Sequence, residues 1–129
     1  MTKIRSPKDL VVYQKAYNLA MEIFQISKTW PKEERYSLTD QIRRSSRSVC
    51  SNFSEAWGKR RYKAYFIKKL TDSDSENLET ISWLNFAYDC EYLNKSDYSR
   101  LINEANEISR ILNSMLFHPE PFLLQNASD

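Results

Sequence analysis

Apolar side chains recur every three or four residues along most of the chain, and no useful length of the alternation typical of a β-strand is present. This spacing predicts four amphipathic helices, at about residues 7–28, 37–57, 61–92 and 97–117. Because the connections between them are short, we expect an all-α fold, an antiparallel up-down four-helix bundle. One domain over residues 1–129 is expected, with a frayed tail at 120–129.

Residues with particular backbone preferences mark the expected helix ends. Ser6 can N-cap the first helix, and Pro7 suits its first helical position. Gly58 is the only glycine, and it is expected to form a left-handed C-cap just after the second helix. Either Asn94 or Ser96 can cap the fourth helix.

Two helices have apolar faces that depart from a single stripe. The first helix carries two adjacent apolar stripes, which predicts burial on two sides, within a bundle or between subunits. The third helix has a stripe interrupted by Ser73 and Asn77, which predicts a buried polar contact near its middle.

Composition limits the class of protein. The N-terminus lacks the apolar segment of a secretory signal, and no apolar run approaches the roughly 18–20 residues that a membrane span requires. Cys50 and Cys90 show no CxxC spacing and are interpreted as two small buried thiols. These features predict a cytoplasmic protein with no membrane partner.

The charges are unevenly distributed although the net charge is only +2. Residues 41–71 hold nine Lys and Arg and one acid, whereas residues 72–107 hold nine Asp and Glu and two Lys and Arg. Such a division is typical of a nucleic-acid-binding surface. It is equally consistent with two halves of one fold that attract each other, or with head-to-tail subunits.

The basic segment supplies the candidate nucleic-acid-binding residues, because arginine and lysine neutralise phosphates. These are Arg43, Arg47, Lys59, Arg60, Arg61 and Lys63. Trp57, Tyr62 and Tyr65 lie among them and are read either as stacking platforms for unpaired bases or as core and interface residues. No motif of a known nucleic-acid-binding fold is present, so sequence-specific readout is not predicted.

Arg44, Asn52 and Glu55 form a second constellation on the second helix. A catalytic site would require a nucleophile or base with a partner, so we interpret the three as a structural polar network. Our hypothesis is that Glu55 pairs with an arginine of the basic segment, in the same chain or across subunits.

The remaining polar residues do not predict an enzyme, a metal site or a cofactor. The only histidine, His118, follows the fourth helix and has no partner in the sequence pattern. One glycine cannot form a glycine-rich phosphate loop, and no ExxH pair is present. An acidic run on the third helix is read as a solvated face that can complement a basic surface: Asp72, Asp74, Glu76 and Glu79.

The segment LTDQIRRSSRSVCSNFSEAWGKR, residues 38–60, resembles the signature of the four-helix-bundle proteins encoded in intervening sequences of bacterial 23S rRNA genes. The positions that match are Leu38, Gln41, Ile42, Arg43, Arg44, Ser48, Val49, Asn52, Phe53, Glu55 and Gly58. Residues 9–24 and 30–38 resemble the first helix and first connection of that family. Ala56 departs from the pattern, since the family usually has glycine there.

The resemblance implies a homo-pentamer with no established enzymatic activity. It extends to the accessory variability determinant of diversity-generating retroelements, which implies binding of RNA or DNA and of a ribonucleoprotein or reverse-transcriptase-like partner. We therefore expect a non-enzymatic oligomeric bundle that binds nucleic acid, most of all RNA, through its basic surface. The alternative is a protein–protein scaffold that docks an acidic partner and has no nucleic-acid role.

Overall fold

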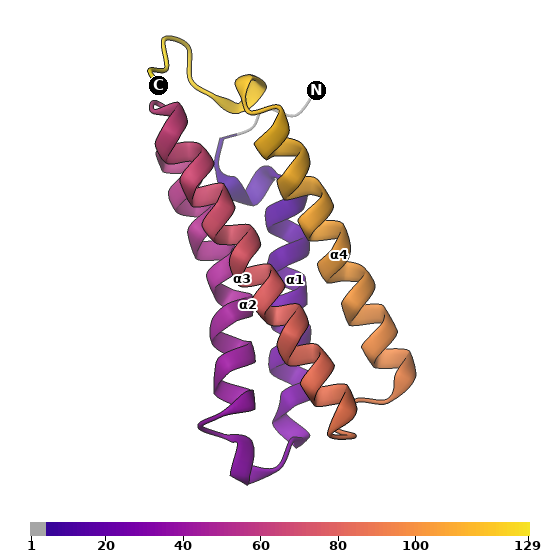
Figure 1. The fold of residues 1–129 in the computed structure, drawn as a ribbon. Coiled ribbons are helices and arrows are strands. Elements are labelled where there is room, and N and C mark those ends of the chain that lie inside the picture. Colours follow the sequence, from indigo (N-terminus) through magenta and orange to yellow (C-terminus); the bar gives the residue numbers. More distant parts are fainter. Residues whose placement is uncertain (1–4) are drawn as a thin grey trace.

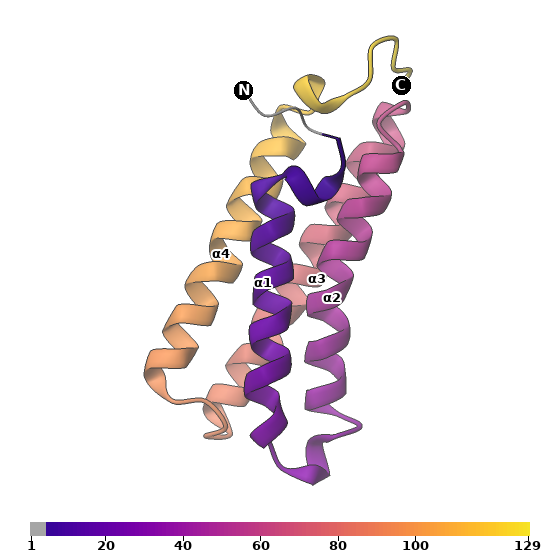
Figure 2. The same cartoon turned by 180° about the vertical axis from the view of Figure 1, so that it is seen from behind.

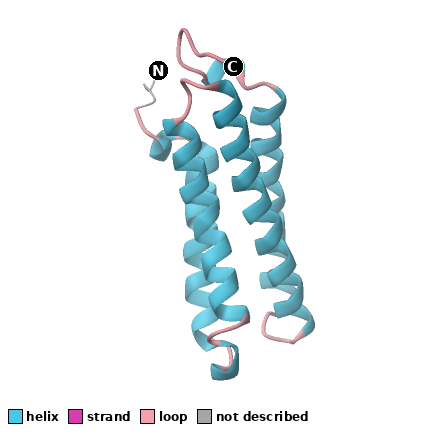
Figure 3. Ribbon diagram, turned by 60° about the vertical axis from the view of Figure 1, so that its left-hand side comes forward, coloured by secondary structure: helices cyan, strands magenta, loops and turns pink. Residues whose placement is uncertain are grey.

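The computed structural model describes residues 5–129. Residues 1–4 lie outside the described residues, although the predicted domain and the predicted absence of a secretory signal include them. Four helices form the fold: α1 (Val11–Ile26), α2 (Leu38–Gly58), α3 (Lys63–Asp89) and α4 (Lys95–Phe117). Successive helices run in opposite directions and lie side by side in an elongated bundle (Figure 1, Figure 2). Over residues 5–129 every regular element is helical, which confirms the predicted fold class (Figure 3).

The first helix is shorter than the predicted range of 7–28. Pro7–Asp9 form a separate 3-10 turn, Leu10 is extended, and α1 begins at Val11. The Asp9 carboxylate accepts the backbone N–H groups of Arg5 and Ser6, at 2.7 and 3.2 Å, and so closes the short turn. Ser6 therefore precedes the 3-10 turn and not the long helix.

The predicted core faces of α2 and α4 are confirmed. On α2 the side chains of Leu38, Ile42, Val49, Phe53 and Ala56 are buried. On α4 the seam of Leu101, Ala105, Ile108, Leu112 and Met115 is buried, and Tyr98 at its start is half-buried. Asn94 is the cap of α4, because its side-chain oxygen accepts the Asp97 N–H at 2.7 Å.

A layer of buried polar contacts crosses the core from α2 to α4. The Ser73 hydroxyl on α3 donates to the Val49 carbonyl of α2 at 2.7 Å, and the hydroxyls of Ser45 and Thr80 share a hydrogen bond of 2.8 Å. On the other side of α3, Asn77 Nδ2 donates to the Ala105 carbonyl and the Ser109 hydroxyl of α4, at 2.8 and 2.9 Å. The prediction of a buried polar contact at Ser73 and Asn77 is confirmed.

The C-terminal segment is attached to the bundle, so the expectation of a frayed tail at 120–129 is wrong. The Lys63 N–H donates to the Ser128 carbonyl at 2.7 Å, and the Ser128 and Leu124 N–H groups donate to the carbonyls of Arg61 and Arg60. Phe122 and Leu123 pack against the core. The segment crosses the end of the bundle at which α2 turns into α3 (Figure 1).

The left-handed C-cap lies at a different helix from the one predicted. Gly58 is the last residue of α2 and has no positive φ, so it is not a left-handed cap. The left-handed residue is Glu91, with φ of 65°, just after α3. There the Tyr92 N–H reaches back to the Ala87 carbonyl at 2.8 Å, the pattern of a Schellman cap.

We expect Asn77→Ala to destabilise the fold by about 1–3 kcal/mol, because it removes two buried donors and leaves the Ala105 carbonyl and the Ser109 hydroxyl without them. Chemical denaturation measures this free energy of unfolding. Ser75→Ala, on the exposed face of the same helix, is the matched control and is expected to change little. Equal effects of the two substitutions would contradict the role assigned to Asn77.

Two cap substitutions test the placement of the left-handed residue. Gly58→Ala is expected to stabilise the fold by about 0.5–1 kcal/mol, because Gly58 is helical and no atom lies within 4 Å of an added Cβ. Glu91→Gly is expected to stabilise as well, because glycine adopts positive φ without strain. Thermal unfolding measures both, and a lower melting temperature for Gly58→Ala would contradict the observed cap.

Candidate nucleic-acid interface

The first group of basic side chains surrounds Phe24 at the end of α1, and we call Lys28, Arg43 and Arg47 the Phe24 cluster. Arg43 Nε donates to the Ser27 hydroxyl at 2.8 Å, and its NH2 group donates to the Phe24 carbonyl at 3.3 Å. The Arg43 and Arg47 guanidinium carbons lie 4.8 and 5.6 Å from the ring centroid of Phe24. Arg43 therefore helps to close the C-terminal end of α1, where a cation is favourable.

An open groove of about 640 Å³ runs beside this cluster and is lined by Phe24, Asp40, Arg43, Arg44, Arg47, Ser48 and Ser51. Arg47 is exposed, and a cation–ring contact at an exposed site gains only about 0.5–1 kcal/mol. Arg47, whose one recorded partner is that ring, can consequently turn toward a phosphate at little cost. Sequence reasoning missed Phe24 and Lys28, although Lys28 follows Phe24 by four residues, in the 3-10 turn Ser27–Thr29 just after α1.

The second group, which we call the turn cluster, consists of Lys59, Arg60 and Arg61 in the connection between α2 and α3. The Arg60 guanidinium carbon lies 3.7 Å from the ring centroid of Trp57, and its Nε donates to the Trp57 carbonyl at 2.8 Å. Burial lowers the pKa of Arg60 from its ordinary value, but a guanidinium stays charged in proteins. Arg61 is exposed, and over residues 5–129 its side chain has no recorded ion pair or hydrogen bond.

The sixth nominated residue, Lys63, lies on α3 beside the turn cluster but already has an acidic partner. Its ammonium lies 3.1 Å from the Glu120 carboxylate in the C-terminal segment. The Lys63 contact lowers the pKa of Glu120, after the larger effect of a backbone hydrogen bond at Glu120 itself. Lys63 is thus less available to a phosphate than the turn cluster.

The nominated residues form two groups and not one surface. Arg47 and Lys59 are twelve residues apart along α2, which corresponds to about 18 Å at 1.5 Å per residue. A nucleic-acid segment of about five base pairs spans that distance at 3.4 Å per base pair.

Arg44, Asn52 and Glu55 do not form one polar network, because Arg44 contacts acidic residues of α3 whereas Asn52 and Glu55 contact Lys69 of α3. Arg44 pairs with Glu76 at 3.4 Å and also with Glu79, both on α3. Burial raises the pKa of Glu76, and the Arg44 guanidinium opposes that rise. The acidic run on α3 is therefore not simply a solvated face.

Glu55 pairs with Lys69 of α3 at 2.6 Å, so the hypothesis of an arginine partner in the same chain is wrong. Lys69 also donates to the Asn52 side-chain oxygen at 3.2 Å and lies 3.5 Å from Asp72. The Glu55 carboxylate raises the pKa of the Lys69 ammonium above its ordinary value. Asn52 itself donates to the Ser48 carbonyl at 2.9 Å, which gives it a structural role.

The three aromatic candidates differ in exposure. Trp57 is half-buried and stacks on Phe53 with the ring centroids 6.5 Å apart. Tyr62 is 44% exposed and Tyr65 is 57% exposed, so these two rings are not part of the core.

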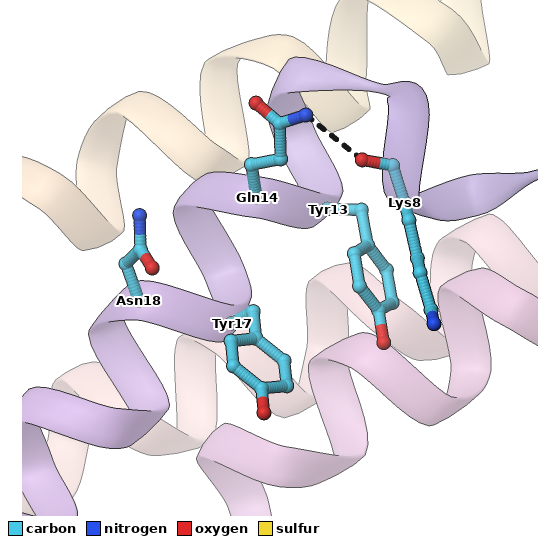
Figure 4. A pocket seen from close by; sticks show the side chains of 5 residues that line it. All are labelled: Lys8, Tyr13, Gln14, Tyr17 and Asn18. Atoms are coloured by element: carbon cyan, nitrogen blue, oxygen red, sulfur yellow. Dashed lines mark hydrogen bonds between the residues drawn. The ribbon is translucent and has the colours of Figure 1, made fainter. Parts of the chain in front are cut away.

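A separate groove of about 500 Å³ lies beside α1 and the 3-10 turn Pro7–Asp9, and it is lined by Lys8, Tyr13, Gln14, Tyr17 and Asn18. Gln14 donates to the Lys8 carbonyl at 2.8 Å, and the rings of Tyr13 and Tyr17 stand near each other with centroids 6.2 Å apart (Figure 4). The groove offers aromatic and amide surface but no acid among its lining residues. It lies outside both basic clusters.

Other candidate chemistry is sparse in the described part of the chain. Over residues 5–129, no group of three or more His, Cys, Asp and Glu side chains is arranged to hold a metal ion. None of the helices among these residues combines the length and hydrophobicity needed to cross a lipid bilayer. Cys50 is buried, which raises the pKa of its thiol to about 11, but Cys90 is exposed, so the interpretation of two buried thiols holds only for Cys50.

Comparison with known proteins identifies relatives of this chain. A solved structure of a protein of unknown function from the S23 ribosomal protein family of Bacteroides thetaiotaomicron is 32% identical, with a TM-score of 0.76. The match covers 84% of this chain and 97% of that one. Curated proteins gave no match. The family model described as 23S rRNA-intervening sequence protein matches residues 8–114, and the chain therefore belongs to that family.

Proposed function

We propose that this protein is a non-enzymatic, oligomeric nucleic-acid-binding module that holds RNA through its basic clusters. The observation that supports the proposal is that most of the candidate nucleic-acid-binding side chains have no acidic partner in the described part of the chain. Over residues 5–129, an acidic partner is recorded for Lys63 but for none of the other five. Those five are Arg43, Arg47, Lys59, Arg60 and Arg61.

The mechanism is electrostatic. Each cation that meets a phosphate releases condensed counterions, so affinity falls as salt rises. Backbone phosphate contacts hold the nucleic acid in place without reading its sequence. Several copies of the clusters in one oligomer act together, because the second contact is effectively intramolecular.

Some of the basic residues of segment 41–71 form ion pairs within the chain. Arg44 is held by Glu76 and Glu79, and Lys69 is held by Glu55 and Asp72. The Arg44 pairs and the Lys69–Asp72 contact join the basic segment 41–71 to the acidic segment 72–107, as expected if two halves of one fold attract each other. Glu55 and Lys69 both belong to the basic segment. The pairs leave the turn cluster uncompensated, so an external anion is the better explanation for its charge.

We also propose that the oligomer is a homo-oligomer, a pentamer as the family resemblance implies, and that the protein is cytoplasmic. Tyr17, which belongs to an apolar stripe predicted to be buried within a bundle or between subunits, is 51% exposed, and Met21 beside it on α1 is 43% exposed. Leu78 and Phe86 on α3 are 53% and 57% exposed. Contact between the α1 face of one copy and the α3 face of the next would be heterologous, the type that closes rings.

The charge distribution supports that pairing of faces. The α1 face borders Arg47, which lines a groove with Tyr17 and Met21. The segment 72–107, to which Leu78 and Phe86 belong, is the acidic part of the chain. Opposite charge on two different faces favours association between neighbouring copies.

Charge removal at unpaired cations tests the nucleic-acid proposal. We expect the triple variant Arg47→Gln, Lys59→Gln and Arg61→Gln to weaken binding of a structured RNA at low salt. The slope of log affinity against log salt should become shallower by up to about three, because each lost phosphate contact removes about one unit. Fluorescence anisotropy with a labelled RNA across a salt series measures both quantities.

The matched control removes the same charge elsewhere, by Lys8→Gln, Lys95→Gln and Arg110→Gln, and is expected to bind nearly as well as the unmodified protein. Equal weakening by both triples would show that net charge alone is responsible. No binding at low salt would overturn the proposal and favour the scaffold for an acidic protein partner.

A second substitution pair tests the homo-oligomer. We expect Tyr17→Asp with Met21→Asp to reduce the assembly to monomers, because two charges would be desolvated in the proposed contact. Size-exclusion chromatography with light scattering measures the mass, which is expected to be five times that of one chain before substitution. Tyr36→Asp is the control, since Tyr36 is 85% exposed in the connection before α2. A monomeric unmodified protein would contradict the assembly.

A further inference from the structure

Two exposed tyrosines stand at the start of α3 beside the turn cluster. Tyr62 and Tyr65 form an edge-to-face pair with centroids 6.0 Å apart and an interplanar angle of 79°. An edge-to-face contact covers a face of only one of the two rings, so much of the aromatic surface stays open to solvent. The exposed fractions of 44% and 57% agree with this geometry.

The Trp57 ring, in the same region, is already in contact with other side chains. One neighbour is Phe53, which stacks on it at 6.5 Å and 21°, and another is the Arg60 guanidinium at 3.7 Å. Contacts with the core and with Arg60 therefore already engage Trp57. Of the three aromatic candidates Trp57, Tyr62 and Tyr65, the two tyrosines therefore offer the more accessible stacking surface.

Two exposed cations without an acidic partner among residues 5–129 lie next to the tyrosine pair. The Lys59 ammonium lies 5.7 Å from the ring centroid of Tyr65, a distance at which cation and ring attract only weakly in water. Arg61 is exposed and comes directly before Tyr62 in the chain. A base that approached the Tyr65 ring would displace the Lys59 ammonium toward the phosphate that accompanies the base.

We propose that Tyr62 and Tyr65, with Lys59 and Arg61, form a binding site for unpaired nucleotides. Bases stack on the two rings, and the flanking phosphates pair with the two cations. The inference rests on the proposed nucleic-acid function and specifies it further, because a base inside a duplex has both faces covered by its neighbours and cannot stack here. The ligand is a single-stranded, looped or bulged segment of nucleic acid.

Charge favours this ligand over a protein partner or a second copy. Four cations lie in the five residues 59–63 that include Tyr62, and over residues 5–129 an acidic partner is found for only one of them, Lys63 with Glu120. Burying the pair in a protein contact would desolvate these cations unless the partner supplied several acids. A nucleic-acid strand supplies a negative charge with every base.

The test compares two strands with the same phosphates. A labelled ten-uridine RNA and an abasic strand of equal length are titrated with the intact protein at low salt, and anisotropy gives both affinities. The base-bearing strand is expected to bind at least about fivefold more tightly, which is the low end of stacking on an aromatic side chain. The deoxyribose versions of both strands show whether the site prefers RNA or DNA.

Three variants locate the effect. Tyr62→Leu with Tyr65→Leu is expected to abolish the preference for bases and to leave the affinity for the abasic strand nearly unchanged. Tyr62→Phe with Tyr65→Phe keeps the rings and is expected to retain the preference. Tyr36→Leu removes an exposed tyrosine that has Arg35 within 6.0 Å at the opposite end of α2, and is expected to change nothing.

The outcomes separate this inference from the proposed function. Equal affinity of the unmodified protein for the two strands would overturn the stacking site while leaving phosphate binding intact. Loss of the preference in Tyr36→Leu as large as in the double leucine variant would also overturn it. If neither strand bound at low salt, the proposed function would fail together with the stacking site.

Discussion

The register of α2 against α3 is the constraint on which the rest of the structure depends. Two buried contacts fix it: the Ser73 hydroxyl bonded to the Val49 carbonyl, and the hydroxyl pair of Ser45 and Thr80. A slip of one helical turn, about 5.4 Å, would separate these buried groups and leave them without hydrogen-bond partners. Asn77 extends the same restriction to α4 through its two donated hydrogen bonds.

This register decides which charges neutralise each other. Residues at similar distances from the turn lie opposite one another, so Arg44 meets Glu79 and Glu55 meets Lys69. Lys59, Arg60 and Arg61 lie in the turn itself, and there the hairpin has no opposite position to supply an acid. The connection between α2 and α3 lies at one end of the bundle (Figure 1), so the same geometry that satisfies the middle of α2 leaves these three cations uncompensated at that end.

The sequence predicted the elements that depend on periodicity and missed those that depend on pairing. Helix number and the core faces of α2 and α4 follow from three- and four-residue spacing. The Lys69 partner of Glu55 becomes predictable only once the turn is placed near residue 60, because pairing across a hairpin leaves no local pattern. The attachment of the C-terminal segment was missed because its hydrogen bonds join backbone groups of Arg60, Arg61 and Lys63, and its apolar contact is limited to the short pair Phe122 and Leu123.

The most direct measurement is ultraviolet cross-linking of a bound RNA that carries unpaired nucleotides, with the modified residues identified by mass spectrometry. The account predicts cross-links at Tyr62 or Tyr65, in the segment 59–65 that covers the α2–α3 connection and the first residues of α3, because bases stack there next to the cations of the turn. Cross-links confined to the outer faces of α1 or α4, with none in that segment, would contradict it.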